Sequence, residues 1–375
     1  MRRFICICAA MAALASCSQK SQVELFPASD FDTVVDGKEV SLYTLKNADL
    51  TMQVTNFGAR VVSLWTPDKK GNHEDIVLGY NNIEKYVNNP GERFLGAVVG
   101  PYANRIAAGT YSIGKETYHF PQNNNGQTLH GGLKGLDMVV WDVLAVDDST
   151  LVFSYTHADG QEGMPGNIEI FMTYTLTSDN EFKVEYLAQT DKPTHVNISH
   201  HSFFNLKGEG NGTINDHILY INGSKTTPVN EVLIPSGELA DVTGTPFDFR
   251  KAKAIETDLY VEDPQLANGA GYDHNWVLDR QTPDQLELAA SVLEPASGRY
   301  MEVWTDQPAL QFYGGNFFDG STVGKYGRAL KYRESIALET QKYPDSPNHP
   351  HFPSTLLNPG EDYTHTCVYR FSTVK

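Results

Sequence analysis

Alternation of apolar and polar residues with a period of two recurs along this 375-residue chain and constrains its fold more than any other feature. Every second side chain is apolar in residues 168–176, and again in residues 182–188 after a Ser-Asp-Asn sequence at 178–180. Successive side chains of a strand face opposite sides of a sheet, so this pair predicts a hairpin with one buried face. Similar alternating stretches lie at 50–56, 59–65, 286–293, 300–304 and 363–371.

Helical periodicity is absent from every long window of the sequence, and 31 glycines with 19 prolines separate short elements. These features predict an all-β protein built as a large antiparallel β-sandwich. The length would allow two domains, yet no low-complexity linker or internal repeat follows residue 30, and large β architectures often exceed the average domain length. We therefore expect residues 31–375 to form a single domain.

The N-terminus has the pattern of an export signal. Two arginines precede an apolar run from Phe4 to Ala15 that is too short to span a bilayer. The sequence Leu14-Ala15-Ser16-Cys17 resembles the box of bacterial lipoproteins, so we expect residues 1–16 to be a signal peptide, Cys17 to carry lipid, and residues 17–30 to be a tether. The protein would then be secreted through the inner membrane and lipid-anchored, facing the periplasm or the cell surface. An ordinary signal peptide with incidental cysteines is the alternative.

The cysteine content indicates whether disulfides can stabilise the protein, and its net charge restricts the classes of ligand that it can bind. Cys6 and Cys8 would leave with the signal, so Cys367 would remain alone and no internal disulfide is expected. The formal net charge of −17 repels nucleic acid and gives no help in binding phosphorylated substrates. We expect a neutral small-molecule ligand, no nucleic acid, and contact with a membrane through the lipid anchor only. The aromatic content of 11% supplies flat faces of the kind that pack against sugar rings.

A carboxylate at the end of an apolar stretch near the C-terminus is the first candidate catalytic residue. Glu339 follows the strand-like residues 335–338 and precedes a segment with five prolines between residues 344 and 359. Proline lacks an N–H and fixes φ, so this segment predicts a stiff irregular loop. Such a loop at a strand end is a common way to hold a catalytic side chain.

Four further segments carry polar residues of the kind that handle sugars and protons. They contain Asn104-Arg105, His130-Gly131-Gly132, His200-His201 and Asp273-His274. Taken singly, each has a structural explanation. Arg105 could form a surface salt bridge, His130-Gly131-Gly132 and Asp273 could form turns, and His200 could be a core residue. His200 and His201 are adjacent in a predicted strand, so they face opposite sides and cannot share one substrate atom.

Taken together and in order, these five segments resemble the aldose 1-epimerase (galactose mutarotase) family over nearly the whole mature chain. The resemblance implies that family's supersandwich fold, with Glu339 as catalytic base and His201 as catalytic acid. It assigns substrate binding to Arg105, His130, Asp273, Asn104 and Gln311, although the segment around Gln311 also reads as a strand and its turn. The chain departs from the family pattern at Pro101, where Arg is usual, and at His200, where Asn is common.

The implied reaction interconverts the α and β anomers of free aldohexoses. A base removes the proton of the anomeric hydroxyl while an acid protonates the ring oxygen, and the opened ring closes again on the other face of the carbonyl. Ordinary pKa values of about 4.3 for Glu and about 6.5 for His suit this exchange. We also expect the negative charge of the protein to favour the imidazolium form of His201.

Signatures of cofactors and metals are missing from the sequence. It contains no His-Glu-x-x-His motif, cysteine cluster, acidic calcium loop, glycine-rich phosphate loop or Gly-x-Ser-x-Gly, so we expect neither a metal nor a nucleotide. Three other functions remain open. These are a glycoside hydrolase that uses Glu339 and Asp273, a non-catalytic sugar-binding lipoprotein, and a phosphosugar epimerase, for which no basic cluster is evident.

Overall fold

The structure, a computed structural model, describes residues 23–375. The predicted signal peptide, the lipidation site Cys17 and the first part of the predicted tether lie outside the described residues. In the described part, α-helix is confined to α1 (Ile83–Asn88) and α2 (Pro264–Asn268), and no helix is long and apolar enough to cross a membrane. Short 3-10 turns are η1 (Ala28–Asp30), η2 (Ala107–Gly109), η3 (Leu136–Met138), η4 (Gln161–Gly163), η5 (Ile255–Thr257) and η6 (Ser346–Asn348).

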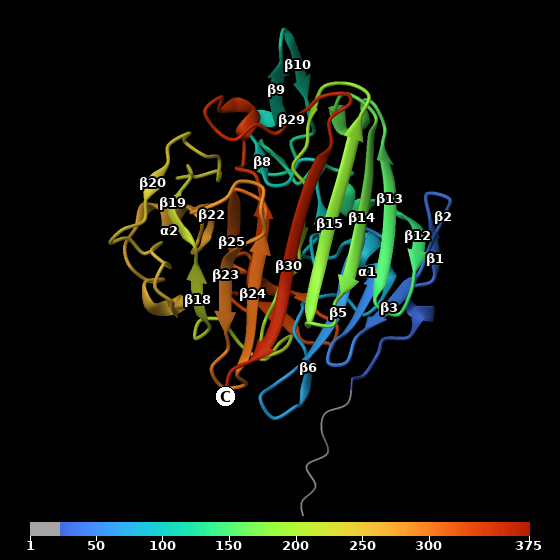
Figure 1. Cartoon of the computed structure of the whole chain (residues 1–375), viewed down its shortest axis with the longest axis vertical. Helices are drawn as coiled ribbons and strands as arrows, with labels where there is room; N and C mark the ends of the chain where they lie inside the picture. The colour runs from blue at the N-terminus through green and yellow to red at the C-terminus, as the bar shows by residue number, and fades with distance from the viewer. Residues whose placement is uncertain (1–22) are drawn as a thin grey trace, which may run out of the picture.

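The largest sheet has nine antiparallel strands in the order β12-β13-β14-β15-β30-β24-β23-β18-β21, and its long strands cross the front of Figure 1. Its strands are β12 (Asp142–Val146), β13 (Thr150–His157), β14 (Ile168–Leu176), β15 (Glu181–Thr190), β18 (Ile218–Ile221), β21 (Lys253–Ala254), β23 (Glu287–Leu293), β24 (Arg299–Thr305) and β30 (Tyr363–Thr373). The C-terminal strand β30 lies in the middle. It pairs with β15, where Tyr363 faces Ala188, and with β24, where Cys367 faces Thr305.

The remaining strands form smaller antiparallel sheets. A five-stranded sheet consists, in order, of β20 (Ala240–Asp241), β19 (Gly223–Thr226), β22 (Asp273–Leu278), β25 (Ala309–Tyr313) and β28 (Ala337–Gln341). A four-stranded sheet consists of β3 (Leu42–Lys46), β4 (Thr51–Thr55), β5 (Arg60–Pro67) and β6 (His73–Asp75). Two-stranded pairs are β1 (Thr33–Val35) with β2 (Lys38–Val40), β7 (Ala97–Val99) with β17 (Ser199–His201), β8 (Arg105–Ile106) with β11 (Thr128–Leu129), β9 (Thr110–Ile113) with β10 (Glu116–His119), β16 (Thr194–His195) with β29 (Leu356–Leu357), and β26 (Asp319–Val323) with β27 (Ala329–Lys331).

Side chains from these sheets meet in a hydrophobic cluster that draws residues from Leu45 to Phe371. In β14, Ile170 and Met172 are buried in it while Phe171 points outward. The predicted hairpin, including its turn, and the predicted strands at 50–56, 59–65, 286–293, 300–304 and 363–371 are all present. The prediction of an all-β antiparallel sandwich is confirmed. One-sided burial of the long strands β14, β15 and β24 produced the period-two pattern, whereas β5, β25 and β28 are buried on both faces.

The segment that precedes η1 packs against the domain. Phe26 donates its amide N–H to Gln53 Oε1 (2.9 Å), and its carbonyl accepts from Gln53 Nε2 (3.0 Å). The Phe26 ring lies 5.8 Å from that of Tyr326, and Phe31 is fully buried. The packed part of the chain therefore includes Phe26, which lies within the segment 17–30 that the sequence predicts as a tether.

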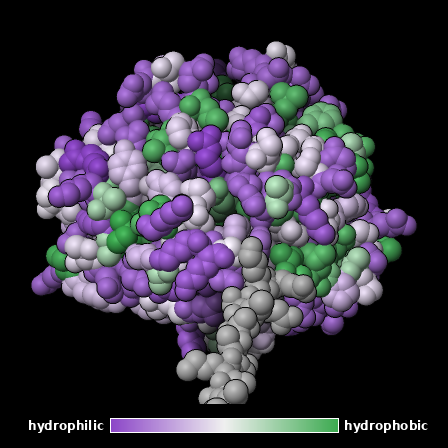
Figure 2. Space-filling view, turned by 60° about the horizontal axis from the view of Figure 1, so that its bottom comes forward, coloured by the Kyte–Doolittle hydropathy of each residue, from purple (hydrophilic) through white to green (hydrophobic). Residues whose placement is uncertain are grey.

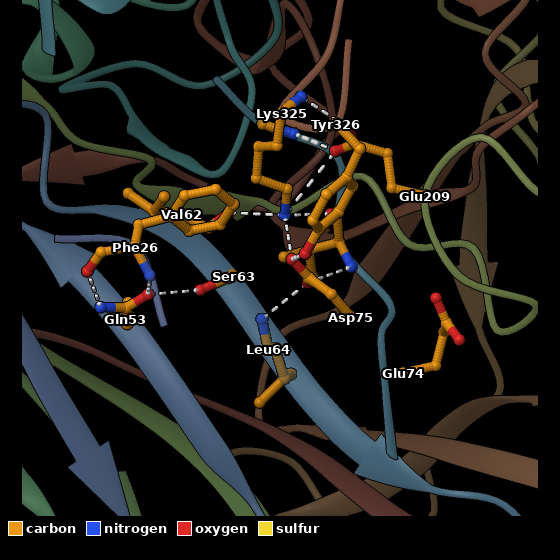
Figure 3. A network of polar contacts seen from close by, with 12 residues as sticks. Phe26, Gln53, Val62, Ser63, Leu64, Glu74, Asp75, Glu209, Lys325 and Tyr326 are labelled. Atoms are coloured by element: carbon orange, nitrogen blue, oxygen red, sulfur yellow. Dashed lines mark hydrogen bonds and ion pairs between the residues drawn. The ribbon is translucent and has the colours of Figure 1, made fainter. Parts of the chain in front are cut away.

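A buried ion cluster beside Phe26 joins β5, β6 and the turn of the β26–β27 hairpin (Figure 3). Lys325 Nζ donates to Asp75 Oδ2 (2.5 Å) and to the carbonyl of Val62 (2.8 Å). Glu209 Oε1 accepts from the Lys325 amide (2.7 Å), and the Tyr326 hydroxyl donates to Asp75 (2.9 Å). Removing Lys325 would leave two buried carboxylates without a cation, which is a strongly destabilising change.

The surface agrees with the polar and acidic composition. On the face shown in Figure 2, hydrophilic residues predominate and hydrophobic residues form separate groups. Apolar residues exposed in scattered groups are normal for a folded protein and do not define a binding face.

Several histidines lie in the interior. Burial, which disfavours the charged imidazolium, lowers the pKa to about 4 in His157 and His365 and to about 3 in His200 and His274. His157 is completely buried, and neither of its ring nitrogens has a hydrogen-bond partner among residues 23–375. These rings are neutral at neutral pH in the folded protein.

We expect buried histidines to weaken the fold in mild acid. Below about pH 6.5 the unfolded chain binds protons at ordinary imidazoles, whereas the buried rings stay neutral until the pH approaches their lowered pKa. Their stabilisation is thus complete above the unfolded pKa and is lost as the pH falls. For His157 the loss at pH 5 is about 2 kcal/mol. Urea titrations at about pH 7 and about pH 5 should show a smaller loss for His157→Phe than for the wild type, and equal losses would contradict this account.

Candidate active site

A pocket of about 290 Å³ opens at the edge of the five-stranded sheet, close to the size of sites that hold small ligands. Charged and polar side chains meet aromatic rings in its wall. Its lining comprises Glu92, Phe94, Asn104, Arg105, Asn124, Asn125, Leu129, His130, His201, Phe203, Leu233, Asp273, Tyr313, Phe317 and Glu339. Every predicted catalytic residue and four of the five predicted binding residues lie here. The fifth, Gln311, holds Asp273 from the neighbouring strand.

Three adjacent strands supply one polar wall. Gln311 of β25 lies opposite Asn275 of β22 and opposite Glu339 of β28, so these three side chains share one face of the sheet. Asp273, two residues before Asn275, projects from the same face and accepts a 2.7 Å hydrogen bond from Gln311 Nε2. The strand registers thus place Asp273 and Glu339 on the same wall.

His201 reaches this wall from β17. Its Nε2 lies 3.4 Å from Oε1 of Glu339, and its ring stacks on Phe203 with centroids 4.6 Å apart. His200 points the other way, into the core, where its ring nitrogens contact the hydroxyls of Ser202 (2.6 Å) and Tyr174 (3.2 Å). The structure agrees with the inference that the two histidines face opposite sides.

His130 lies next to His201 in the pocket wall, with the two ring centroids 5.3 Å apart in an edge-to-face arrangement. Its Nδ1 accepts a hydrogen bond from the backbone N–H of Asn104 (3.1 Å), so the neutral ring carries its proton on Nε2. The following Gly131 has φ of +86°, and a Cβ there would lie 2.0 Å from the Gly100 carbonyl. The His-Gly-Gly sequence is thus a close backbone approach that turns a donor nitrogen toward the pocket.

Arg105 forms the cationic part of the pocket. Its Nε donates to Asn124 Oδ1 (3.2 Å), and its backbone N–H donates to the side chain of Asn104 (2.9 Å). Burial lowers the pKa of its guanidinium, while Asp273 and Glu339 oppose that change. Asn104 uses its side-chain oxygen to shape this turn, so only its amide nitrogen is available to a ligand.

Burial dominates the electrostatics of the catalytic pair. It raises the pKa of Glu339 well above the usual range, with Asp273 adding to the effect and Arg105 opposing it. It lowers the pKa of His201 to about 3. The expectation that the net charge of the protein favours imidazolium is therefore wrong for His201, because local desolvation outweighs screened distant charges.

The side-chain atoms of His130, His201 and Glu339 that could bind a metal ion lie within 4.8 Å of one another. The spacing of these residues in the sequence did not indicate such a cluster. Two histidines and a carboxylate are a known zinc-ligand set. Here, however, the Asn104 N–H keeps a proton on His130 Nε2, and the Arg105 guanidinium disfavours a cation. These two features fit an uncharged hydroxylated ligand better than a metal ion.

Aromatic and acidic residues of the wall were not identified from the sequence. Phe94 packs edge-on against His130 (4.7 Å) and is stacked 6.0 Å from His201. Tyr313 and Phe317 stack at 5.8 Å, and Phe317 is 57% exposed. Glu92 adds a third carboxylate. Phe317 directly follows residues 311–316, the segment around Gln311 that resembles the family, and this position was the available signal in the sequence.

Comparison with known proteins agrees with this geometry. A model of the aldose 1-epimerase family matches residues 41–370. The chain is 40% identical over 336 residues to galactose mutarotase of Mus musculus, which spans 90% of this chain and 95% of the relative. It is 37% identical over 339 residues to aldose 1-epimerase of Escherichia coli (strain K12), which spans 90% and 96%.

The chain belongs to the aldose 1-epimerase family. Two solved structures of epimerase relatives share its fold. The aldose epimerase homologue from C. elegans gives a TM-score of 0.83 at 30% identity, covering 90% of this chain and all of that one (100%). Galactose 1-epimerase from Lactobacillus acidophilus NCFM gives 0.80 at 29% identity, covering 92% and 98%. The resemblance inferred from five motifs and the mutarotase-like supersandwich that it implied are confirmed.

Proposed function

We propose that this protein is an aldose 1-epimerase, an isomerase that interconverts the α and β anomers of free aldohexoses of the glucose and galactose type. The contact between His201 Nε2 and Glu339 Oε1 carries the proposal. The anomeric oxygen and the ring oxygen of an aldose are bonded to the same carbon, so an acid and a base that act on them together must be neighbours. A separation of 3.4 Å meets that requirement.

One proton distributed between Glu339 and His201 is sufficient for the whole cycle. In the Glu⁻/HisH⁺ form, Glu339 takes the proton of the anomeric hydroxyl while His201 Nε2 gives its proton to the ring oxygen. The bond from C1 to the ring oxygen breaks and the C1 carbonyl forms. The pair is left as GluH/His, and rotation about C1–C2 followed by the reverse transfers gives the other anomer.

The direction of the pKa shifts caused by burial fits this cycle. Burial raises the pKa of Glu339 and lowers that of His201, so it favours the uncharged GluH/His form, which accompanies the open-chain sugar. Such strongly interacting groups titrate as a pair, and the pair is active while it holds one proton. The net charge of the pair is the same in both forms, so no charge has to enter or leave the buried pocket during turnover.

The remaining polar residues hold the sugar in place. Asp273 accepts from hydroxyls, and Gln311 fixes its carboxylate. Arg105 donates to hydroxyl oxygens with the planar fork of its guanidinium. His130 donates from Nε2 near the ring oxygen and assists His201. Phe203, stacked on His201, supplies an apolar face that excludes water from the acid.

Purified protein should speed the polarimetric equilibration of fresh α-glucose or α-galactose, and prior treatment with a chelator should not reduce the rate. Other common aldoses extend the assay to pentoses. Failure to accelerate any of them would refute the epimerase proposal. Release of reducing ends from a glycoside in the same preparation would instead support the hydrolase alternative.

Substitutions should separate catalytic from structural histidines. We expect Glu339→Gln and His201→Asn each to lower kcat by about 10²- to 10⁴-fold, the range for a positioned acid or base. His200→Asn should have a mild effect, because its ring faces the core. Rates from polarimetry give the comparison, and equal losses for His200 and His201 variants would contradict the roles assigned here.

The lipid anchor is a second part of the proposal. Cys17 carries lipid and holds the enzyme on a membrane that faces the periplasm or the cell exterior. The support is the Leu14-Ala15-Ser16-Cys17 sequence behind two arginines and a short apolar run. A bacterial lipoprotein cysteine carries several acyl chains, and stable anchoring requires more than one.

Wild-type protein should therefore sediment with membranes and enter detergent, whereas Cys17→Ser should yield soluble and active enzyme, because Cys17 lies before the folded domain. Fractionation and mass spectrometry of the N-terminal peptide provide the measurement. An unmodified Cys17 in soluble wild-type protein would refute the anchor without affecting the epimerase assignment.

A further inference from the structure

The segment Gly91–Leu95, here called the strap, crosses the pocket and is held by contacts from distant parts of the chain. Arg60 Nη1 donates to the carbonyls of Arg93 (2.7 Å) and Leu95 (3.1 Å). The Tyr80 hydroxyl donates to the Glu92 carbonyl (3.2 Å). A Cβ on Gly91 would lie 2.2 Å from Thr322 Oγ1, so the strap also packs closely on β26.

The Arg93 side chain adds a second set of contacts. Its Nε and Nη2 bind the two oxygens of Asp137 (2.6 and 2.9 Å), and Nη1 donates to the Gly132 carbonyl (3.0 Å). Asp137 is fully buried, and Arg60 donates to its carbonyl (2.8 Å). The strap is therefore a rigid part of the pocket wall.

Glu92 is part of the strap and lines the pocket. Its Oε1 accepts from the Phe94 amide (2.9 Å), and no ion pair involves it among residues 23–375. The nearest arginines do not neutralise it through a direct contact, because Arg60 and Arg93 are bound to Asp137 and backbone carbonyls. A preorganised carboxylate thus lines the pocket without a direct ion pair among residues 23–375. Burial raises the pKa of Glu92, while the charges of Arg60 and Arg93 oppose that change.

The charges around the pocket allow the Glu92 carboxylate to discriminate between ligands of different charge. Glu92, Asp273 and Glu339 line the pocket with a single guanidinium, that of Arg105. Asp273 is the carboxylate that acts most strongly on Arg105, and the Glu339–His201 pair has no net charge while it holds one proton, so the charge of Glu92 is not balanced within the pocket lining. A ligand with a positive substituent near Glu92 would gain an ion pair, whereas a negative substituent would be repelled by its carboxylate in a partly desolvated site.

We propose that Glu92 is a specificity residue that favours aldoses bearing an ammonium group, such as 2-amino-2-deoxyhexoses, over neutral aldoses and disfavours uronic acids. The proposal rests on the epimerase function and adds the charge class of its substrates. It assigns Glu92 a contact with the substrate substituent and no part in the proton transfers.

Glu92→Gln is the informative variant, because the amide oxygen of Gln can still accept from Phe94 and the strap keeps its remaining contacts. Initial rates of anomer exchange are measured by NMR for D-glucosamine, D-glucose and D-glucuronate at a pH where the amine is protonated. The variant should lower kcat/KM for glucosamine relative to glucose by about tenfold and raise the value for glucuronate relative to glucose. Glu169→Gln, on the exposed outer side of β14, should leave both ratios unchanged.

Calorimetric dissociation constants for the same three sugars provide the ratios without turnover. An equal change for all three sugars in Glu92→Gln, or ratios within about twofold of wild type by both methods, would overturn the proposal. Wild-type protein that binds the sugars without exchanging their anomers would refute the epimerase function, and the binding ratios would still decide the role of Glu92.

Discussion

The carboxylate of Glu339 and the imidazole of His201 contact each other in a site that excludes water, and the rest of the structure depends on keeping water out of this contact. Glu339 lies on a sheet that would expose it to solvent if nothing covered the polar wall of β22, β25 and β28. The cover comes from loops that arrive from far along the chain, carrying His130, Arg105 and the strap. Each of these loops is itself fixed by buried polar contacts, such as Asn104 with His130 and Arg93 with Asp137.

Buried charge recurs in this protein as clusters in which each ion has several partners. The Lys325–Asp75–Glu209 cluster and the Arg60–Arg93–Asp137 cluster both tie a loop to the sheet on which it lies. Burying an ion requires such compensation, and a partly satisfied cluster would be worse than an apolar contact. Rigidity around the pocket follows, because the loops cannot move without exposing or isolating these charges.

Much of the fold was predictable because local patterns and burial agree. The hairpin of β14 and β15 has a buried face along its whole length, so alternation identified it. The opposite orientations of His200 and His201 followed from strand geometry alone. The family resemblance was unnecessary for those inferences. It was needed to bring Glu339, Arg105 and Asp273 into one site, since the pairing of their strands is not encoded locally.

Other features depend on contacts that no local pattern reports. Glu92 and Phe94 lie in an irregular segment whose position is set by Arg60 and Asp137, which are distant in sequence. Phe26 is held by Gln53, a residue distant in the sequence, so packing on the domain begins before residue 31, where the sequence predicted that the domain starts. The protonation of His201 could not be derived from net charge, because its environment is decided by which side chains enclose it.

The position of β30 in the middle of the nine-stranded sheet has a consequence for biosynthesis. Its partners β15 and β24 have no neighbour on one side until residues 363–373 leave the ribosome. The large sheet therefore cannot be completed before the end of translation. Its completion requires pairing between residues that are distant in the sequence, such as Ala188 and Tyr363. Long-range pairing of this kind slows folding and leaves strand edges open to aggregation. Truncation of only the final strand would leave two unpaired strand edges, those of β15 and β24, in the centre of the sheet.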